Sequence, residues 1–125
     1  METRLASRVN ISINVNSRID AKKDQQVILA EGNRFSAVAC NISVLGIAIR
    51  VKYFLPKGLV LDLEIDGIYF GLEGPMKIKA EVRHCDYVKY RTYECGLKFL
   101  DITAQYKKAI ENFVSARGKK KKKTS

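Results

Sequence analysis

Residues 76–83, MKIKAEVR, alternate strictly between apolar and charged side chains. The apolar side chains are those of Met76, Ile78, Ala80 and Val82, and the charged ones are those of Lys77, Lys79, Glu81 and Arg83. Because successive side chains of a β-strand point to opposite faces, this period predicts a strand with one buried face and one solvated face. The same period recurs along most of the chain, and it therefore decides the fold class.

Five other segments share this alternation and are expected to be strands. They begin or lie at about residues 9–15, 35–40, 46–51, 59–65 and 93–99. Asp66-Gly67 predicts a tight turn after the segment at 59–65. The polar residues 16–34 fit an extension of the first strand into a long hairpin.

The period changes from two to helical spacing after the last predicted strand. Tyr106, Ile110, Phe113 and Val114 form one apolar stripe, which predicts an amphipathic helix that packs on the strands. Thr103 is a suitable N-cap, and a glycine at 118 is placed to end the helix. Six amphipathic strands and a closing helix predict a mainly β fold, a small six-stranded antiparallel barrel flanked or plugged by a C-terminal helix.

The length of 125 residues predicts a single domain. We expect the domain to span 1–117, with a flexible arginine arm at 1–8, the barrel at 9–102 and the helix at 103–117. Residues 118–125 are expected to form a disordered lysine-rich tail. The stretch RGKKKKKTS at 117–125 carries six of the 23 basic side chains, so the net charge of +10 belongs largely to this end. Such a run is either simply solvated or attracts nucleic acid or an anionic membrane without specificity.

Composition also narrows the compartment and the chemistry. The chain has no apolar run long enough to span a bilayer and no signal-peptide pattern, which predicts a cytoplasmic protein. Cys40, Cys85 and Cys95 form no CxxC pair, so they are expected to be small buried hydrophobes.

The sequence offers little for catalysis. His84, the single histidine, lies between Arg83 and Cys85, and adjacent strand residues point to opposite faces, so a Cys–His couple is not favoured. A structural histidine is the simpler interpretation. Neither glycine-rich phosphate loop is present. We therefore expect no enzyme, no metal site and no cofactor.

Two short motifs carry more information than the composition does. RLASR at 4–8 places Arg4 and Arg8 before the first strand, and NISVLG at 41–46 places Asn41, Ser43 and Gly46 between the second and third strands. Asn and Ser supply hydrogen-bond donors and acceptors, and glycine permits positive φ or a close approach to the backbone. Taken alone, NISVLG also fits an ordinary Asx or Ser turn between two strands.

Together these motifs resemble those of the PilZ domain, which carries RxxxR on an N-terminal arm and [D/N]xSxxG at the junction of its second and third strands. The resemblance extends to PKGLVLDLEI, to ECGLKF and to the following DITAQYKKAIENF, and so covers about residues 4–114. It implies a six-stranded β-barrel that binds cyclic di-GMP on its outer surface. In this interpretation cyclic di-GMP is a bound ligand, and the domain needs no cofactor.

The resemblance implies a role for each motif residue. Arg4 and Arg8 would pair with the two phosphates and reach or stack on the guanines, which suits the planar guanidinium. Asn41 would bond a guanine edge, Ser43 would add a hydroxyl contact, and Gly46 would keep the surface open. The family more often has Asp at the first motif position, and because Asn has one acceptor oxygen, weaker binding is expected.

Arg50 and Arg83 are secondary candidates for the guanine pocket. Alternation places both side chains outward, on strands expected to be neighbours. The alternative is that both are ordinary solvated charges.

The leading hypothesis is a single-domain cyclic di-GMP receptor or adaptor in bacterial second-messenger signalling. Its arginine arm would order over the ligand and change a surface that an unknown downstream protein reads. One alternative is an interaction module of the same fold that binds no ligand. Another is a small-barrel nucleic-acid binder, which the pattern disfavours because it places Tyr93 and Phe99 inward.

Overall fold

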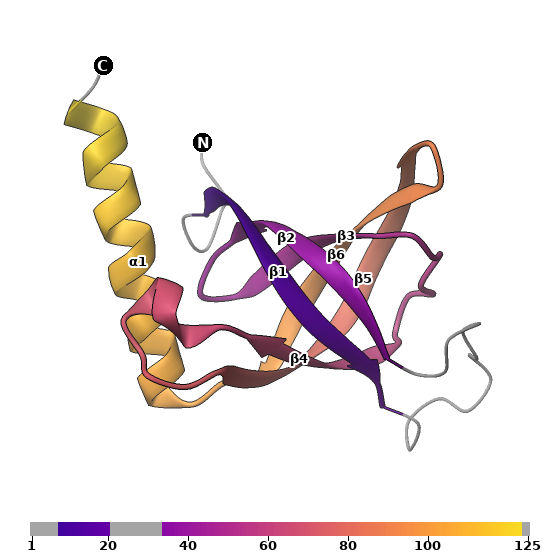
Figure 1. The fold of residues 1–125 in the computed structure, drawn as a ribbon, viewed down its shortest axis with the longest axis horizontal. Coiled ribbons are helices and arrows are strands. Elements are labelled where there is room, and N and C mark those ends of the chain that lie inside the picture. The colour runs from indigo at the N-terminus through magenta and orange to yellow at the C-terminus, as the bar shows by residue number, and fades with distance from the viewer. Residues whose placement is uncertain (1–7, 21–33, 124–125) are drawn as a thin grey trace.

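Six strands close into an antiparallel barrel in the order β1-β2-β3-β6-β5-β4 (Figure 1). The computed structural model describes residues 8–20 and 34–123, with side chains up to residue 117. The strands are β1 (Val9–Ile19), β2 (Arg34–Ile42), β3 (Gly46–Val51), β4 (Val60–Ile65), β5 (Met76–Lys89) and β6 (Thr92–Asp101). The predicted six-stranded antiparallel barrel with one C-terminal helix is confirmed.

The barrel interior is filled by the apolar side chains of the alternating segments. In β4 the side chains of Leu61, Leu63 and Ile65 are at most 1% exposed, and Asp62 and Glu64 between them face outward. In β5 Met76, Ile78, Ala80 and Val82 point inward, as the opening pattern predicts. Each fully buried aliphatic side chain contributes about 1.5–3 kcal/mol, so this period-two pattern stabilises the closed barrel.

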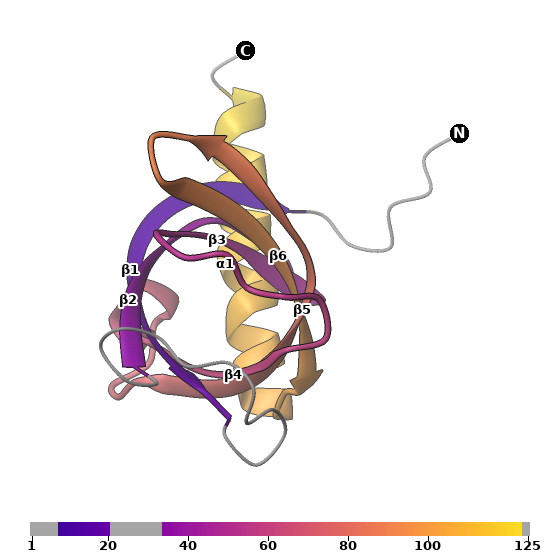
Figure 2. The same ribbon diagram turned by 90° about the vertical axis from the view of Figure 1, so that its right-hand side faces the viewer.

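The helix α1 (Ala104–Lys123) lies across one open end of the barrel (Figure 2). The Thr103 hydroxyl accepts a hydrogen bond from the Tyr106 N–H at 3.2 Å, which confirms the predicted N-cap. Ile110 is fully buried, and the Phe113 ring lies 4.6 Å from that of Phe70 between centroids. Phe70 belongs to η1 (Gly67–Phe70), a short 3₁₀ helix between β4 and β5.

The predicted helix end at Gly118 is wrong, because α1 continues to Lys123. The backbone of 118–123, expected to belong to the tail, is part of this helix, and the disorder of 118–125 stays a prediction. A glycine inside a helix costs only about 1 kcal/mol relative to alanine, and lysine is a good helix former. One glycine followed by lysines is thus too weak a signal to end this helix.

Two other expectations about local structure are corrected. Asp66-Gly67 forms no two-residue turn, since the Asp66 carboxylate accepts a hydrogen bond from the Ile68 N–H at 3.1 Å and caps η1. Strand β5 does not end near Arg83 but continues to Lys89. Residues beyond Arg83 are mostly exposed, so their sequence carries no alternation of burial. Among the described residues, no helix is both long and apolar enough to cross a bilayer.

Candidate functional site

The N-terminal arm joins the barrel beside the second motif. β1 and β2 pair with Val9 opposite Ile42 and Asn10 opposite Asn41. Arg8 directly precedes β1 and is exposed, so it enters next to residues 41–43. Strand pairing thus brings Arg8 and the NISVLG segment together, although they are far apart in sequence. Arg4 lies outside the described residues.

A continuous row of outward-facing positions crosses five strands from this point. Register partners link Asn10 to Asn41, Asn41 to Ala48, Ala48 to Gly96, and Gly96 to His84. We call these five positions the small-residue row, because its centre consists of alanine and glycine. Between Asn41 and His84 the row contains only Ala48, which is 7% exposed, and Gly96, which lies beneath the His84 ring, so its centre is low but largely covered.

His84 ends the row opposite Gly96. A Cβ atom at Gly96 would clash with Nε2 of the His84 ring, so the imidazole lies over the glycine backbone. Its Nδ1 lies 3.0 Å from Oδ2 of Asp86 on the same strand. The residues around His84 in the sequence do not predict that its ring lies over Gly96, because this contact depends on the pairing of β5 with β6.

The Asn41 side chain is half-buried at the arm end of the row. Within the described residues, its amide makes no hydrogen bond. Because an Asn amide offers both a donor and an acceptor, Asn41 has the free polar atoms that a guanine edge would need.

Ser43 and Gly46 have clear roles in the fold. The Ser43 side chain is buried, and its hydroxyl accepts a hydrogen bond from the Leu45 N–H at 3.1 Å. The backbone N–H of Ser43 donates to the Gly46 carbonyl at 2.9 Å. This is the Ser turn that the motif alone also fits. A Cβ at Gly46 would clash with the Leu97 carbonyl oxygen, so the glycine permits β3 and β6 to approach.

Arg50 and Arg83 lie beside the row, on β3 and β5. Arg50 follows Ala48 on the outer face of β3, and its Nε donates to Glu94 at 3.2 Å. Arg83 occupies a bulge in β5 and pairs with Glu81 at 3.3 Å. The expectation that their strands are neighbours is wrong, because β6 lies between β3 and β5. The position of β6 between β3 and β5 cannot be inferred from the order of the strands along the chain.

Three free cysteines lie near this surface. Cys40, in a β2 bulge beside the row, approaches the Ala48 carbonyl oxygen at 3.5 Å, and burial raises the pKa of its thiol. Cys85 and Cys95 are register partners, with Sγ atoms 2.8 Å apart, and burial also raises the pKa of Cys95. No group of His, Cys, Asp or Glu in the described part of the chain could hold a metal ion.

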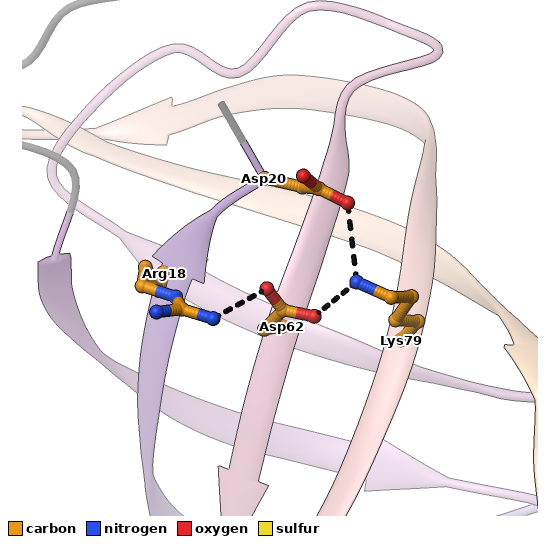
Figure 3. A network of polar contacts seen from close by, with 4 residues as sticks. All are labelled: Arg18, Asp20, Asp62 and Lys79. Carbon is orange, nitrogen blue, oxygen red and sulfur yellow. Dashed lines mark hydrogen bonds and ion pairs between the residues drawn. The ribbon is translucent and has the colours of Figure 1, made fainter. Parts of the chain in front are cut away.

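A hollow of about 720 Å³ lies elsewhere on the barrel, over β1, β2, β4 and β5, and contains none of the motif residues. Figure 3 shows the ion pairs at its edge: Asp62 accepts from Arg18 at 3.1 Å and from Lys79 at 2.7 Å. Lys79 also pairs with Asp20 at 3.1 Å. The hydrogen bond to Asp62, followed by that to Asp20, raises the pKa of Lys79. These charges neutralise one another, which is typical of a solvated face.

Solved structures with the same fold include PilZ proteins and a regulator of motility. The Bacillus subtilis inhibitor of motility, MotI/DgrA, superposes with a TM-score of 0.75 at 18% identity, over 97% of this chain and 54% of that one. The complex of K. pneumonia MrkH with c-di-GMP gives 0.69 at 14% identity, over 100% and 57%. The chain therefore spans little more than half the length of these two proteins.

The PilZ domain of Escherichia coli YcgR, solved with c-di-GMP, matches over nearly its whole length. Its TM-score is 0.66 at 11% identity, over 98% of this chain and 97% of that one. At these identities the likeness shows the fold. No curated protein sequence matches significantly. The sequence profile of the PilZ domain, however, matches residues 2–116, nearly the whole described chain, and the protein therefore belongs to the PilZ domain family.

Proposed function

We propose that this PilZ domain is a cytoplasmic receptor for cyclic di-GMP that holds the ligand on the small-residue row. The observation that carries the proposal is the pairing of β1 with β2, which brings Arg8 beside Asn41 at one end of a low, uncharged strip. Two solved relatives of the same fold contain c-di-GMP. We propose ligand binding, and no catalysis, as the activity of the domain.

The row suits the two halves of the ligand. Arg8, with Arg4 from the arm, would form charge-assisted hydrogen bonds with the phosphates. Asn41 would bond the edge of a guanine. The exposed His84 ring would move off Gly96, and the small side chains of Ala48 and Gly96 would then leave room for the flat base above the strand backbone. Arg50 and His84, at the margins of the row, would contact the base by stacking. Arg83, in the bulge before His84, pairs with Glu81 and is the weakest of these candidates.

Signalling would follow from ordering of the arm. Arg117 of α1 donates a hydrogen bond from Nη2 to the Asn10 carbonyl at 3.0 Å, and its guanidinium lies 5.2 Å from the Phe113 ring centre. Asn10 is also the register partner of Asn41. A ligand that draws Arg4 and Arg8 onto the row would therefore act on the residue that holds α1 to β1. A downstream protein would read this change.

Isothermal titration calorimetry with cyclic di-GMP tests the proposal. Arg8→Ala is expected to weaken binding about 10- to 100-fold, because a hydrogen bond to a charged group contributes about 1.5–3 kcal/mol. Asn41→Ala is expected to weaken it about 3- to 10-fold, because a neutral hydrogen bond contributes about 0.5–1.5 kcal/mol. Arg18→Ala is the matched control, since Arg18 is an exposed arginine of β1, the strand that follows Arg8, and it pairs with Asp62. Equal affinity for wild type and both row variants would contradict the assignment.

The competing function is a PilZ interaction module that binds no ligand. It is favoured by one observation, that Ser43 and Gly46 both serve the β2–β3 turn and the approach of β6. In that case cyclic di-GMP would produce neither heat nor any amide chemical-shift change in wild type.

A further inference from the structure

The β5–β6 hairpin extends beyond the barrel. β4 pairs with β5 only between Ile65 and Val60, whose partner is Glu81, and β3 pairs with β6 as far as Tyr93. β5 and β6 continue to pair with each other to Lys89 and Thr92. Figure 1 shows this hairpin rising away from the other strands. Its tip is therefore a convex projection in which neither β5 nor β6 pairs with a third strand.

The tip is built with an unfavourable backbone. Tyr90 and Arg91 have φ values of 52° and 60°, in the left-handed region that Asn and Gly adopt most readily. A two-residue hairpin turn of this kind strongly prefers Asn-Gly. The chain instead places an aromatic and a cationic side chain there, and Tyr90 is 91% exposed. Backbone strain retained at an exposed position indicates that the side chains serve a purpose.

Aromatic side chains continue down the hairpin from Tyr90. The Tyr93 ring makes edge-to-face contacts with Tyr87 at 5.6 Å and with Phe54 at 6.0 Å. Tyr87 and Phe54 are 63% and 57% exposed. Tyr93, which the sequence pattern placed inward, is only half-buried because the barrel ends at its partner Val51. Phe99, deeper in the same strand, is buried as predicted.

The charge around these rings is basic. Lys52, Lys89 and Arg91 are exposed, and in the described part of the chain none of them forms an ion pair. The nearby acids are engaged on the outer face of the hairpin, Glu94 with Arg50 and Asp86 with His84. Both views place the lysine-rich end of α1 on the same side of the molecule as the hairpin tip (Figures 1 and 2).

We propose that the hairpin tip docks this protein on an anionic lipid surface. We call the tip, with Phe54, Tyr87, Tyr90 and Tyr93 and the bases Lys52, Lys89 and Arg91, the aromatic–basic tip. Tyrosine favours the interface between headgroups and hydrocarbon, and lysine and arginine are attracted to anionic headgroups. A projection and a helix end on one side can touch a flat surface together.

A single-stranded nucleic acid fits this surface less well. Such ligands use a basic groove whose aromatic faces are open for stacking. Here the surface is convex, and three of the rings cover one another edge to face. The lipid proposal goes beyond ligand binding and stands whether or not the domain binds cyclic di-GMP.

Vesicle co-sedimentation of the full chain tests the proposal, using phosphatidylcholine vesicles with and without one third phosphatidylglycerol. The decisive variant is Tyr90→Asn with Arg91→Gly, because Asn-Gly relieves the backbone strain while it removes both side chains. We expect a higher urea midpoint and, from the loss of one cation and one interfacial ring, a roughly tenfold lower partition coefficient on the anionic vesicles.

The matched control removes the same chemistry elsewhere. Tyr69→Asn with Lys77→Ser replaces an exposed tyrosine of η1 and an exposed lysine at the far end of β5, and is expected to partition like wild type. Because the chain has no tryptophan, Tyr90→Trp also provides a single reporter. Its emission is expected to shift to the blue on anionic vesicles only.

Three results would overturn the proposal. One is a partition coefficient of the variant with Tyr90→Asn and Arg91→Gly that equals that of wild type, which would leave the lysines of α1 as the cause of binding. Another is equal or absent binding to the two vesicle types. The last is displacement from vesicles by a single-stranded oligonucleotide whose own binding falls in the same variant, which would assign the tip to nucleic acid.

Discussion

Two parts of the outer barrel surface have the same strand geometry but opposite chemistry. On the small-residue row, side chains are short and the Asn41 amide has no partner in the described part of the chain. Elsewhere, two rows of register partners cross β2, β1, β4 and β5, which we call the charged rows. They are Arg34, Arg18, Asp62 and Lys79, and Ser36, Asn16, Glu64 and Lys77.

The contrast separates a solvated face from the surface that we propose as the ligand site. On the charged rows, Asp62 accepts from both Arg18 and Lys79, so these three charges are paired within the protein. Exposed pairs of this kind add little to stability, about 0–1 kcal/mol each. The small-residue row has polar side chains at its margins and, at its centre, a buried alanine and a glycine beneath the exposed His84 ring.

The largest effect on stability is expected from a side chain at Gly46, where the backbones of β3 and β6 lie close together. Gly46→Ala would place its Cβ against the Leu97 carbonyl oxygen and force β3 from β6. We expect the free energy of unfolding in urea to fall by about 3 kcal/mol, the upper range for overpacking. Gly74→Ala is the control, since a Cβ there meets nothing within 4 Å. Similar stability of the two variants would show that the strands can separate freely.

Filling the centre of the row is expected to affect the ligand more than the fold. Gly96→Val would displace the His84 ring, whose far end can move into solvent. We expect at least a tenfold loss of cyclic di-GMP affinity, because a side chain would stand where the base must lie, and a stability loss of about 1 kcal/mol. Asn16→Val on the charged rows should leave the affinity unchanged. Equal affinities for both variants would place the ligand elsewhere.

Restoring the residue more usual in the family should strengthen binding. Asn41→Asp adds a second acceptor and charge to the contact with guanine, and such hydrogen bonds are roughly twice as strong as neutral ones. We expect about a three- to tenfold higher affinity by calorimetry. Asn14→Asp, an exposed position farther along β1, controls for the added charge. A weaker Asn41→Asp complex would mean that Asn41 faces a phosphate instead of a base.

Breaking the charged rows should cost a little stability and no affinity. Asp62→Asn is expected to lower the free energy of unfolding by about 1 kcal/mol at neutral pH, since two ion pairs are weakened. The raised pKa of Lys79 gives a pH signature. Its contribution is complete below the unfolded lysine pKa of about 10.4 and is lost as pH rises through the folded value. Urea unfolding between pH 9 and 12 should show a shallower decline in the variant.

The smallest effect concerns the thiol beside the row. Because burial raises the pKa of Cys40, its thiolate is scarce near pH 8, and labelling by a small disulfide reagent should be slower than in urea. A ligand on the row should slow it further. A variant with Cys85→Ser and Cys95→Ser isolates this signal. Faster labelling on addition of cyclic di-GMP would indicate that the ligand opens the β2 bulge.

Much of the barrel could be predicted because burial in a strand is a local, period-two property. The segments around Leu61 and Ile78 show it directly, and Thr103 marks the helix start through an equally local hydrogen bond. Predictions failed where burial gives no period or where the signal is weak. Residues beyond Arg83 form a strand that neither face buries, and Gly118 is a mild helix breaker overcome by its neighbours.

For the candidate site, the sequence by itself determined which residues to examine, since RLASR and NISVLG are contiguous motifs with recognisable chemistry. Only the tertiary structure decided which residues meet. Barrel closure inserted β6 between β3 and β5, joined Ala48 to Gly96 and His84, and separated Arg50 from Arg83. It also left Tyr93 at the barrel's end instead of inside. The physical reason is that strand order and register arise from pairing between segments distant in the chain, which alternation within any one segment cannot encode.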